Sequence, residues 1–392
     1  MKVVLCSNYL THHQVPFCNS MYQKLGDDFK FISTQTMEAE RTNAGWALGA
    51  QPPYEIKSHE SEKNMRIAKS LINECDILLI GSADEALVSD RIRQNKIIFR
   101  TYERIYKKGR WRAVSPRGIY NIISHHTVNK NKNIYLLCSS AYTAGDFALL
   151  GAYKNKCFKW GYFPETKKYD IAELMQQKTN TKTEIIWCAR FISWKHPEIP
   201  VEIMKRLKDE HIDAHLTMIG NGRLLEQTVC TASKYSLSDD ITFINKLSPE
   251  DVRKAMEKSN IFLFTSDHNE GWGAVLNESM NSGCAVVANH AIGAVPYLIN
   301  DKENGLIYKN GDIDMAYRKI KMLAENKNMQ IYMGKNAYHT ISAQWNAENA
   351  AERLLNLANA ALNGESLDIY PTGICSKDKF LSNHWYKEKK NA

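Results

Sequence analysis

The sequence predicts an α/β protein built from two doubly wound, Rossmann-like domains. Short apolar segments alternate with segments of helical periodicity along most of the 392 residues. Strands that alternate with helices form parallel sheets with helices on both faces. The alternation occurs in two blocks, and the chain is longer than one hydrophobic core usually allows. We therefore expect a ligand in a cleft between two domains, at the carboxyl ends of the strands.

The first domain is expected to span residues 1–165. Its apolar segments predict strands at residues 3–7, 29–33, 77–80, 96–100, 134–138 and 157–161. Helical periodicity occurs between them, for example at residues 16–25, 62–73 and 140–153.

The second domain, residues 166–367, shows the same rhythm more clearly. Strands are predicted at residues 184–189, 215–219, 241–244, 261–265, 285–288 and 305–308. Helices are predicted at residues 197–208, 222–234, 249–258, 273–281, 312–325, 329–342 and 346–362. A polar, lysine-rich linker at residues 163–183 separates the domains. The tail, residues 368–392, has weak periodicity, and one expectation is that it packs back on the first domain.

Composition argues against a membrane-spanning or secreted protein. No segment approaches the roughly 18 consecutive apolar residues of a membrane-spanning helix. The apolar run at residues 3–6 is too short for a secretory signal. Nine cysteines are scattered without a CxxC pair, which favours reduced thiols in the cytosol and argues against zinc. We expect a cytoplasmic protein.

Positive charge is concentrated in the first domain. The net charge is +8, and residues 91–132 contain twelve basic residues and one acidic residue, Glu103. Tyrosine and tryptophan interleave with these cations, which suits an anionic membrane surface at the inner face of the plasma membrane or a lipid phosphate. A solvated basic face is an equally weighted alternative. The pattern is also compatible with nucleic acid, but we expect no nucleic-acid partner.

The most informative segment is residues 270–278, EGWGAVLNE. It follows the apolar segment 261–265 and leads into a predicted helix, so a strand, a glycine-bearing turn and a helix start meet there. The first turn of a helix attracts anions, and small residues let a ligand approach the backbone. The carboxylates of Glu270 and Glu278 would instead accept hydrogen bonds from hydroxyls. A sugar nucleotide offers phosphates and hydroxyls together. The alternative is a solvated glutamate in a loop and another on a helix surface.

Two further strand ends carry candidate ligand-binding groups. Gly220 and Gly222 follow a predicted strand as an incomplete dinucleotide fingerprint, because Leu225 stands where the third glycine belongs. Arg190 and Lys195 follow another strand and could stabilise a diphosphate leaving group. Taken alone, these cations could also belong to a surface loop, which is the less favoured alternative.

Together these segments resemble the carboxyl-terminal domain of the retaining glycosyltransferases of family 4, which have the GT-B fold. The family shows a strand followed by Arg and Lys, a strand followed by Gly-x-Gly, and the Glu-x7-Glu segment. Small residues like 282–288, a loop like 292–297 and a strand like 303–308 come next, in the same order. The resemblance covers roughly residues 184–362. The family includes enzymes that build bacterial surface polysaccharides.

The resemblance implies a role for each of these groups. Arg190 and Lys195 would hold the donor diphosphate, Glu270 would contact hydroxyls of the transferred sugar, and Glu278 would bind the ribose. The remaining donor contacts would come from Gly220, Gly222, Gly271, Trp272, Gly273, Ala274 and Val275, with the base near Asn245, Lys246 and Leu247. A nucleotide-diphosphate sugar is then the co-substrate, the acceptor is a saccharide or a polyprenyl-linked sugar, and no metal or other cofactor is needed.

The first domain matches the family less closely. Many members carry a histidine near the reaction centre, whereas the corresponding segment here contains Tyr102, Glu103 and Arg104. Glu103 or Arg104 would take that place, with His12 and His13 as further candidates in the loop after the first strand. The pair His125-His126 is interpreted as structural. The missing histidine keeps open the alternative of a scaffold that binds sugar nucleotides without turnover. A GT-B sugar-nucleotide epimerase, which shares the two-domain fold, is a second alternative. A phosphorylase that needs inorganic phosphate is a third alternative.

The sequence Asp312-Ile313-Asp314 matches the DxD pattern of metal-dependent glycosyltransferases of another fold. It follows a glycine and opens a predicted helix, so an N-cap explains Asp312 better than a metal does.

Overall fold

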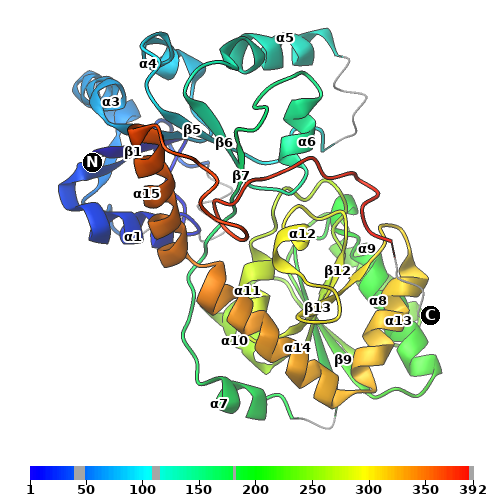
Figure 1. Cartoon of the computed structure of the whole chain (residues 1–392). Coiled ribbons are helices and arrows are strands. Elements are labelled where there is room, and N and C mark those ends of the chain that lie inside the picture. The colour runs from blue at the N-terminus through cyan, green and yellow to red at the C-terminus, as the bar shows by residue number, and fades with distance from the viewer. Residues whose placement is uncertain (39–48, 108–114, 180–181, 388–392) are drawn as a thin grey trace. The chain divides into compact units, whose positions relative to one another are not determined.

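The computed structural model describes residues 1–38, 49–107, 115–179 and 182–387, and it contains two compact units. Unit 1 consists of Met1–Glu165 and Trp345–Ser382. Unit 2 consists of Thr166–Gln344 and the described residues from Asn383 onward. The chain therefore passes from one unit to the other after Glu165, Gln344 and Ser382. Both units are α/β, which confirms the predicted fold class (Figure 1).

Unit 1 contains a seven-stranded sheet whose strand pairs are all parallel, in the order β3-β2-β1-β4-β5-β6-β7. Its strands are β1 (Val3–Ser7), β2 (Phe29–Ser33), β3 (Glu55–Lys57), β4 (Ile77–Ile80), β5 (Ile98–Tyr102), β6 (Ile134–Cys138) and β7 (Cys157–Lys159). Its α-helices are α1 (Val15–Leu25), α3 (Glu62–Glu74), α4 (Ser89–Arg93), α5 (Pro116–His125), α6 (Thr143–Ala148) and α15 (Ala347–Asn363). Strands such as β1 and β4 are buried along their whole length, as expected of a parallel sheet covered on both faces.

Unit 2 contains a six-stranded parallel sheet in the order β10-β9-β8-β11-β12-β13. Its strands are β8 (Thr183–Cys188), β9 (Ala214–Ile219), β10 (Ile241–Ile244), β11 (Ile261–Phe264), β12 (Ala285–Asn289) and β13 (Gly305–Tyr308). Its α-helices are α7 (Ile171–Gln176), α8 (Glu198–Asp209), α9 (Leu225–Lys234), α10 (Pro249–Lys258), α11 (Val275–Asn281), α12 (Val295–Leu298), α13 (Ile313–Ala324) and α14 (Lys327–His339).

Local sequence signals explain where several helices begin. Helix α10 starts at Pro249 after Ser248, whose hydroxyl accepts a hydrogen bond from the Asp251 backbone N–H at 3.1 Å. Asp312 caps α13 in the same way, with its carboxylate 2.8 Å from the Met315 nitrogen, as the sequence predicts. Asp314, the second acid of the DxD sequence, pairs with Arg206. Among the described residues, no cluster of three or more metal-ligating side chains is present.

The structure corrects the expected elements of unit 1. The short edge strand β3 and the helix α5 were not predicted, and β5 begins at Ile98 instead of residue 96. Helix α6 covers six residues within the expected 140–153. Basic and polar residues around residue 117 mask the short amphipathic pattern of α5, which explains why periodicity alone misses it.

Helix α15 was expected to lie in the second domain, residues 166–367. In the structure it belongs to unit 1. It packs against α1, where Lys24 and Glu352 lie 4.0 Å apart, and Figure 1 shows the two helices side by side. The tail that follows is held to the same unit. Arg353 donates hydrogen bonds to the carbonyls of Thr372 and Ile374, and Cys375 donates to the Lys159 carbonyl at 2.8 Å.

The last described residues belong to unit 2. The Tyr386 hydroxyl donates to the Ile307 carbonyl at 2.6 Å, and His290 contacts the Asn383 carbonyl at 3.1 Å. No helix among the described residues is both long and apolar enough to cross a membrane.

Candidate functional site

The sheet of unit 2 has a topological switch point between β8 and β11, where the strand order reverses. Strands β9 and β10 are added on one side of β8, whereas β11, β12 and β13 continue on the other. Loops that follow two strands at such a switch point leave the sheet in opposite directions and open a crevice at its carboxyl edge. The loop after β8 carries Arg190 and Lys195, and the loop after β11 carries Glu270. The topology therefore brings these three predicted residues to one place.

Hydrogen bonds fasten the loop after β8 to the end of β11. The indole N–H of Trp187 donates to the Thr265 hydroxyl at 2.8 Å, and that hydroxyl donates to the Lys195 carbonyl at 2.6 Å. The backbone N–H of Asp267 donates to the Trp194 carbonyl at 3.0 Å. Trp187 and Thr265 are buried, so these bonds fix the backbone of Lys195 from below. The sequence analysis missed both residues, because each lies within or next to an apolar strand and looks like ordinary core.

Lys195 and Glu270 form an ion pair in this crevice. The two residues are 9% and 8% exposed, so both charges are largely removed from water. The Lys195 ammonium also lies 4.4 Å from the ring centroid of Trp194, a favourable cation–π contact. Arg190 is exposed, and its guanidinium carbon lies 6.0 Å from the same ring. Trp194 thus lies next to both predicted diphosphate ligands.

His196 connects the same two loops. Its imidazole lies 2.8 Å from a Glu198 oxygen and 3.3 Å from an Asp267 oxygen. Hydrogen bonds to Asp267 and Glu198 raise the pKa of His196 to about 9. Burial opposes the change at Asp267, but hydrogen bonds from His196 and Asn269 hold the pKa of that carboxylate below its ordinary value. His196 was not predicted as a site residue. Its contact with Asp267, which is 71 residues away in the sequence, becomes visible only in the folded structure.

The segment from Gly271 to Val275 enters α11 without a side-chain cap. Gly273 has φ +88, and a Cβ there would lie 2.6 Å from the Phe264 ring. Any larger residue would therefore disturb the turn after Glu270. The Trp272 side chain is fully buried, and its indole N–H donates a hydrogen bond to the Asn277 side chain at 2.9 Å. Only the backbone of Trp272 is therefore available to a bound sugar nucleotide. Ala274 and Val275 are half-buried at the helix start.

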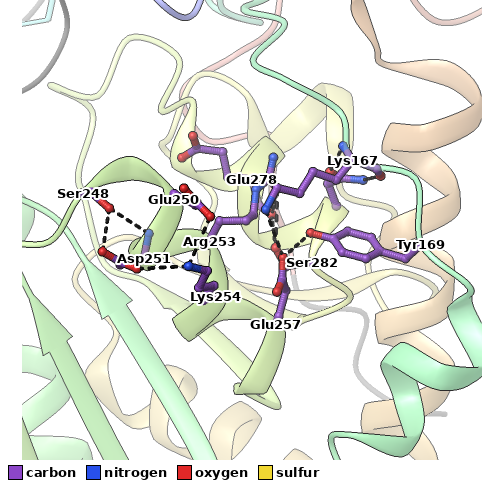
Figure 2. Close-up of polar contacts among 11 residues, drawn as sticks. Lys167, Tyr169, Ser248, Glu250, Asp251, Arg253, Lys254, Glu257, Glu278 and Ser282 are labelled. Carbon is purple, nitrogen blue, oxygen red and sulfur yellow. Dashed lines mark hydrogen bonds and ion pairs between the residues drawn. The ribbon is translucent and has the colours of Figure 1, made fainter.

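Glu278 lies in the first turn of α11 and is half-buried. Burial raises the pKa of its carboxyl group, and the nearby Arg253 opposes this rise. Arg253 comes from α10 and donates to the Glu278 carbonyl at 2.6 Å (Figure 2). It also contacts the Ser282 hydroxyl at 3.4 Å, so it ties α10 to the middle and to the carboxyl-terminal end of α11. Arg253 was not predicted, because its sequence context is that of a surface helix.

The two glycines after β9 have a role that the sequence did not indicate. A Cβ at Gly220 would lie 2.0 Å from the Ala189 carbonyl oxygen, and one at Gly222 would lie 2.5 Å from the Phe191 carbonyl oxygen. The Phe191 backbone N–H donates to the Asn221 carbonyl at 2.8 Å. The glycines therefore make room for the loop that carries Arg190, and their contact with a donor remains a prediction.

The expected base-binding residues follow β10, at the outer edge of the sheet. Asn245 and Lys246 are exposed, and Leu247 is half-buried. The Gly220 backbone N–H donates to the Ile244 carbonyl at 2.9 Å, so the turn after β9 and the end of β10 are adjacent.

Unit 1 has its own switch point, between β1 and β4. A pocket opens there at the carboxyl edge of the sheet, and Ser7, His13, Gln14, Thr101 and Tyr162 are among its lining residues. Burial, and then the neighbouring His12, lower the pKa of His13 to about 3, so this imidazole is neutral over the physiological range. Burial also lowers the pKa of His12, whose ring centroid is 3.8 Å from that of His13. The pocket thus presents neutral hydrogen-bonding groups.

The three residues predicted near the reaction centre separate in the structure. Glu103 pairs with Lys107 and accepts a hydrogen bond from the Tyr162 hydroxyl at 2.6 Å, which places it beside the pocket. Tyr102 instead packs edge-on against His126 and Phe147. Successive residues of a strand point to opposite faces, so Thr101 reaches the pocket and Tyr102 does not.

Arg104 lies in the interior of unit 1. It is 3% exposed, its guanidinium lies 3.7 Å from the Asp146 carboxylate, and it stacks 4.6 Å from the Tyr142 ring centroid. Its contact with an acceptor or a phosphate remains a prediction. His126 is likewise buried, 2.6 Å from the Tyr153 hydroxyl and 3.1 Å from Arg100.

Comparison with known proteins shows which class of protein the chain resembles. Residues 170–340 match the family model described as glycosyl transferases group 1. The matched segment contains Arg190, Lys195, Glu270 and Glu278. The chain thus has the GT-B fold, and residues 170–340 of unit 2 are similar to glycosyl transferases group 1.

Individual relatives follow from the same comparisons. An uncharacterized glycosyltransferase of Methanocaldococcus jannaschii is 27% identical over 193 residues, which cover 48% of each chain. A GDP-mannose-dependent monoacylated phosphatidylinositol monomannoside mannosyltransferase of Corynebacterium glutamicum is 25% identical over 182 residues, 45% of this chain and 47% of the relative. The chain thus spans about half the length of these relatives. The structure of HepE from Anabaena with UDP matches with a TM-score of 0.67 and 14% identity, over 92% of this chain and 100% of that chain.

Proposed function

We propose that the chain is a retaining, metal-independent glycosyltransferase of family 4. It would move a sugar from a nucleotide-diphosphate sugar to a saccharide or lipid-linked acceptor on the cytoplasmic side of the membrane, in the synthesis of a cell-surface polysaccharide. The observation that carries the proposal is the buried pair of Lys195 and Glu270 at the switch point of a group 1 domain. In this pair, the Lys195 ammonium would bind a phosphate and the Glu270 carboxylate would accept hydrogen bonds from sugar hydroxyls.

Binding of the donor would exchange the partners of this pair. The diphosphate would take the place of the Glu270 carboxylate beside Lys195, and Glu270 would turn to hydroxyls of the sugar. Glu278 would accept hydrogen bonds from the ribose. The structure of HepE contains UDP, which makes uracil the first base to test, while the mannosyltransferase named above is GDP-mannose-dependent.

Departure of the nucleoside diphosphate builds negative charge, which preorganised cations stabilise. Lys195 is preorganised, because Thr265 anchors its backbone and Trp194 holds its ammonium. Retention would follow from attack of the acceptor hydroxyl on the face that the diphosphate leaves. The departing phosphate would accept the proton of that hydroxyl. Lys195 and Arg190 would supply the charge that a metal supplies in other folds.

The neutral pocket of unit 1 supports a saccharide as the acceptor. Its hydroxyl and imidazole groups can hydrogen-bond to sugar hydroxyls, and Tyr162 adds an aromatic ring. Glu103 holds the Tyr162 hydroxyl and is the candidate for orienting this ring.

The deciding experiment measures release of UDP or GDP from UDP-glucose and GDP-mannose, with and without alkyl glycosides and a polyprenyl-phosphate sugar as acceptors. Transfer that depends on an acceptor supports the proposal. Isomerisation of the donor without an acceptor would identify an epimerase, and binding without consumption would identify a scaffold. A requirement for inorganic phosphate would identify a phosphorylase.

Variants test the assignment of the site. Glu270→Ala should abolish transfer while UDP binding persists, whereas Glu278→Ala should chiefly weaken UDP binding, by roughly tenfold for one lost charged hydrogen-bond acceptor. Glu250→Ala is the matched control, because Glu250 is exposed on α10 and pairs only with the exposed Lys254 among the described ion pairs. Normal transfer by both site variants would refute the assignment.

A further inference from the structure

His196 occupies an unusual backbone position between the two loops of the candidate donor site. It follows Lys195 directly and has φ 51 and ψ 58, in the left-handed region that residues other than glycine seldom adopt. A side chain in such a conformation persists where the surrounding structure holds it. The reason for a histidine at this position should therefore lie in the contacts of its ring.

The imidazole of His196 joins two carboxylates. Its Nδ1 lies 2.8 Å from a Glu198 oxygen, and its Nε2 lies 3.3 Å from an Asp267 oxygen. An ionised carboxylate accepts hydrogen bonds and cannot donate them, so both ring nitrogens carry hydrogen and the ring is a cation. The Glu198 side chain is 59% exposed, whereas that of Asp267 is 14% exposed. The contact with Asp267 is thus the one that is better shielded from water.

Asp267 organises the turn that carries Glu270. One oxygen of its carboxylate accepts hydrogen bonds from the backbone N–H and from the side-chain amide of Asn269, both at 2.8 Å. Its backbone carbonyl accepts a hydrogen bond from the Glu270 backbone N–H at 3.0 Å. The other carboxylate oxygen faces His196. His196 therefore holds the residue around which the backbone folds up to Glu270.

Lys195 and Glu270 are anchored by different contacts. The Thr265 hydroxyl, at the end of β11, holds the Lys195 carbonyl. The backbone of Glu270 depends instead on Asp267 and on a longer hydrogen bond of 3.4 Å, which the Gly293 backbone N–H donates to the Glu270 carbonyl. Loss of the His196 ring should therefore displace Glu270 and leave the backbone of Lys195 in place.

We propose that His196 is a positioning residue, which acts through Asp267 to direct the Glu270 carboxylate at the sugar of a bound sugar nucleotide. His196 itself would not touch the ligand. Recognition of the sugar would depend on this contact, and recognition of the diphosphate on the separate anchor of Lys195. The inference rests on the proposed function for the identity of the ligand, and it adds the residue that sets the geometry of the sugar-binding carboxylate.

Two substitutions separate the two contacts of His196. Asparagine can place an amide near the position of Nδ1, toward Glu198, whereas glutamine reaches as far as Nε2, toward Asp267. His196→Asn should weaken binding of UDP-glucose about five- to tenfold but binding of UDP less than about twofold, because only the side of Glu270 loses a charge-assisted hydrogen bond. His196→Gln should keep most of the affinity for UDP-glucose. Isothermal titration measures both ligands, and GDP and GDP-mannose replace them if the chain binds guanine.

Two controls separate positioning from a general loss of structure. His211→Asn changes a histidine that is exposed and has a similar backbone, with φ 56. Glu198→Gln removes the charge of the more exposed partner but keeps an oxygen that accepts from Nδ1. Both should bind UDP and UDP-glucose as the unmodified chain does. Equal weakening of the two ligands by His196→Asn, or the same loss of UDP-glucose binding in His196→Gln, would overturn the proposal and leave the proposed function intact.

A measurement without any ligand tests the same geometry. In the unmodified chain, Glu270→Ala breaks the ion pair with Lys195 and should lower the unfolding temperature. In the His196→Asn background Glu270 is already displaced, so the same substitution should lower it by about half as much or less. Equal lowering in the two backgrounds would overturn the proposal. Unequal lowering in a chain that binds neither UDP-glucose nor GDP-mannose would contradict the proposed function, and it would support His196 as the residue that positions Glu270.

Discussion

At the scale of single residues, the Lys195–Glu270 pair determines how the candidate donor site behaves without a ligand. Two charges that are about nine-tenths buried tolerate one another only as a pair. Removal of one partner leaves a charge in a poor solvent, which costs more than the pair itself contributes. The pair therefore also keeps the site in one arrangement before the donor arrives.

We predict that Glu270→Ala lowers the free energy of unfolding by about 2–3 kcal/mol in the absence of nucleotide. UDP should restore stability more strongly in the variant than in the unmodified chain, because the diphosphate can replace the missing carboxylate beside Lys195. Thermal unfolding with and without UDP measures both effects. An equal gain from UDP in the two proteins would show that the diphosphate does not reach Lys195.

His196 makes stability depend on pH. Its pKa in the folded chain is about 9, above its ordinary value of 6.5. The contribution of protonated His196 is therefore complete below about pH 6.5 and is lost as the pH rises through about 9. We predict that His196→Asn destabilises the chain by about 1–2 kcal/mol at pH 6, after allowance for the partial exposure of the ring, and by much less at pH 9.5.

Denaturant unfolding at the two pH values checks this prediction. Asparagine suits the left-handed backbone at this position, where φ is 51, so the substitution removes charge without new strain. His211→Asn is the matched control, since His211 is exposed and has φ 56. The prediction is wrong if the His196 and His211 variants show the same pH dependence.

At the scale of elements, the turn after β9 and the loop after β8 behave as one unit of structure. The backbone of Gly222 fills the space beside the Phe191 carbonyl, and neither segment can shift alone. We predict that Gly222→Ala displaces the loop with Arg190 and weakens UDP binding at least about tenfold, because the misplaced cation loses its contact with the diphosphate.

Isothermal titration with UDP measures the effect of Gly222→Ala. Gly311→Ala is the matched control: Gly311 has φ +81, but no atom lies within 4 Å of its added Cβ. It should cost only the backbone strain of about 1 kcal/mol and leave UDP binding unchanged. Equal loss of affinity in both variants would point to strain alone.

The sequence predicted those elements whose signal is local. Strands β11, β12 and β13 are continuous apolar runs, and the spacing of Glu270 and Glu278 is visible without a structure. Effects between distant segments were not predictable in this way. Thr265 and His196 act through partners about 70 residues away, and the Arg104 guanidinium finds Asp146 only after β5 and α6 come together.

At the scale of the whole molecule, a late segment of the chain, Trp345–Ser382, completes the first unit. Helix α15 and the segment up to Ser382 belong to unit 1, although unit 2 lies before them in the sequence. Periodicity predicted the helix but could not show which sheet it covers, because its apolar stripe would suit either one.

We predict that Arg353→Ala lowers the stability of unit 1 by about 1–2 kcal/mol, because the Thr372 and Ile374 carbonyls lose their shared donor. Hydrogen exchange should rise around Cys375 and in β7, which it pairs with, and should stay unchanged in β11 and β12. Lys335→Ala, at a position on α14 of unit 2, is the control. Faster exchange throughout unit 2 would show that the tail stabilises more than its own unit.

The chain crosses between the units three times, after Glu165, Gln344 and Ser382. The main part of unit 2, residues 166–344, is therefore inserted into the sequence of unit 1. In an engineered chimera, residues 166–344 could be exchanged as one cassette, while the pocket of unit 1 stays behind. The cassette would need residues 383–387 as a second, separate piece, because Tyr386 is hydrogen-bonded to Ile307 inside it. A recombination that moves only one of the two pieces should yield a poorly folded hybrid, so an exchange of unit 2 between related chains is expected to carry residues 383–387 along.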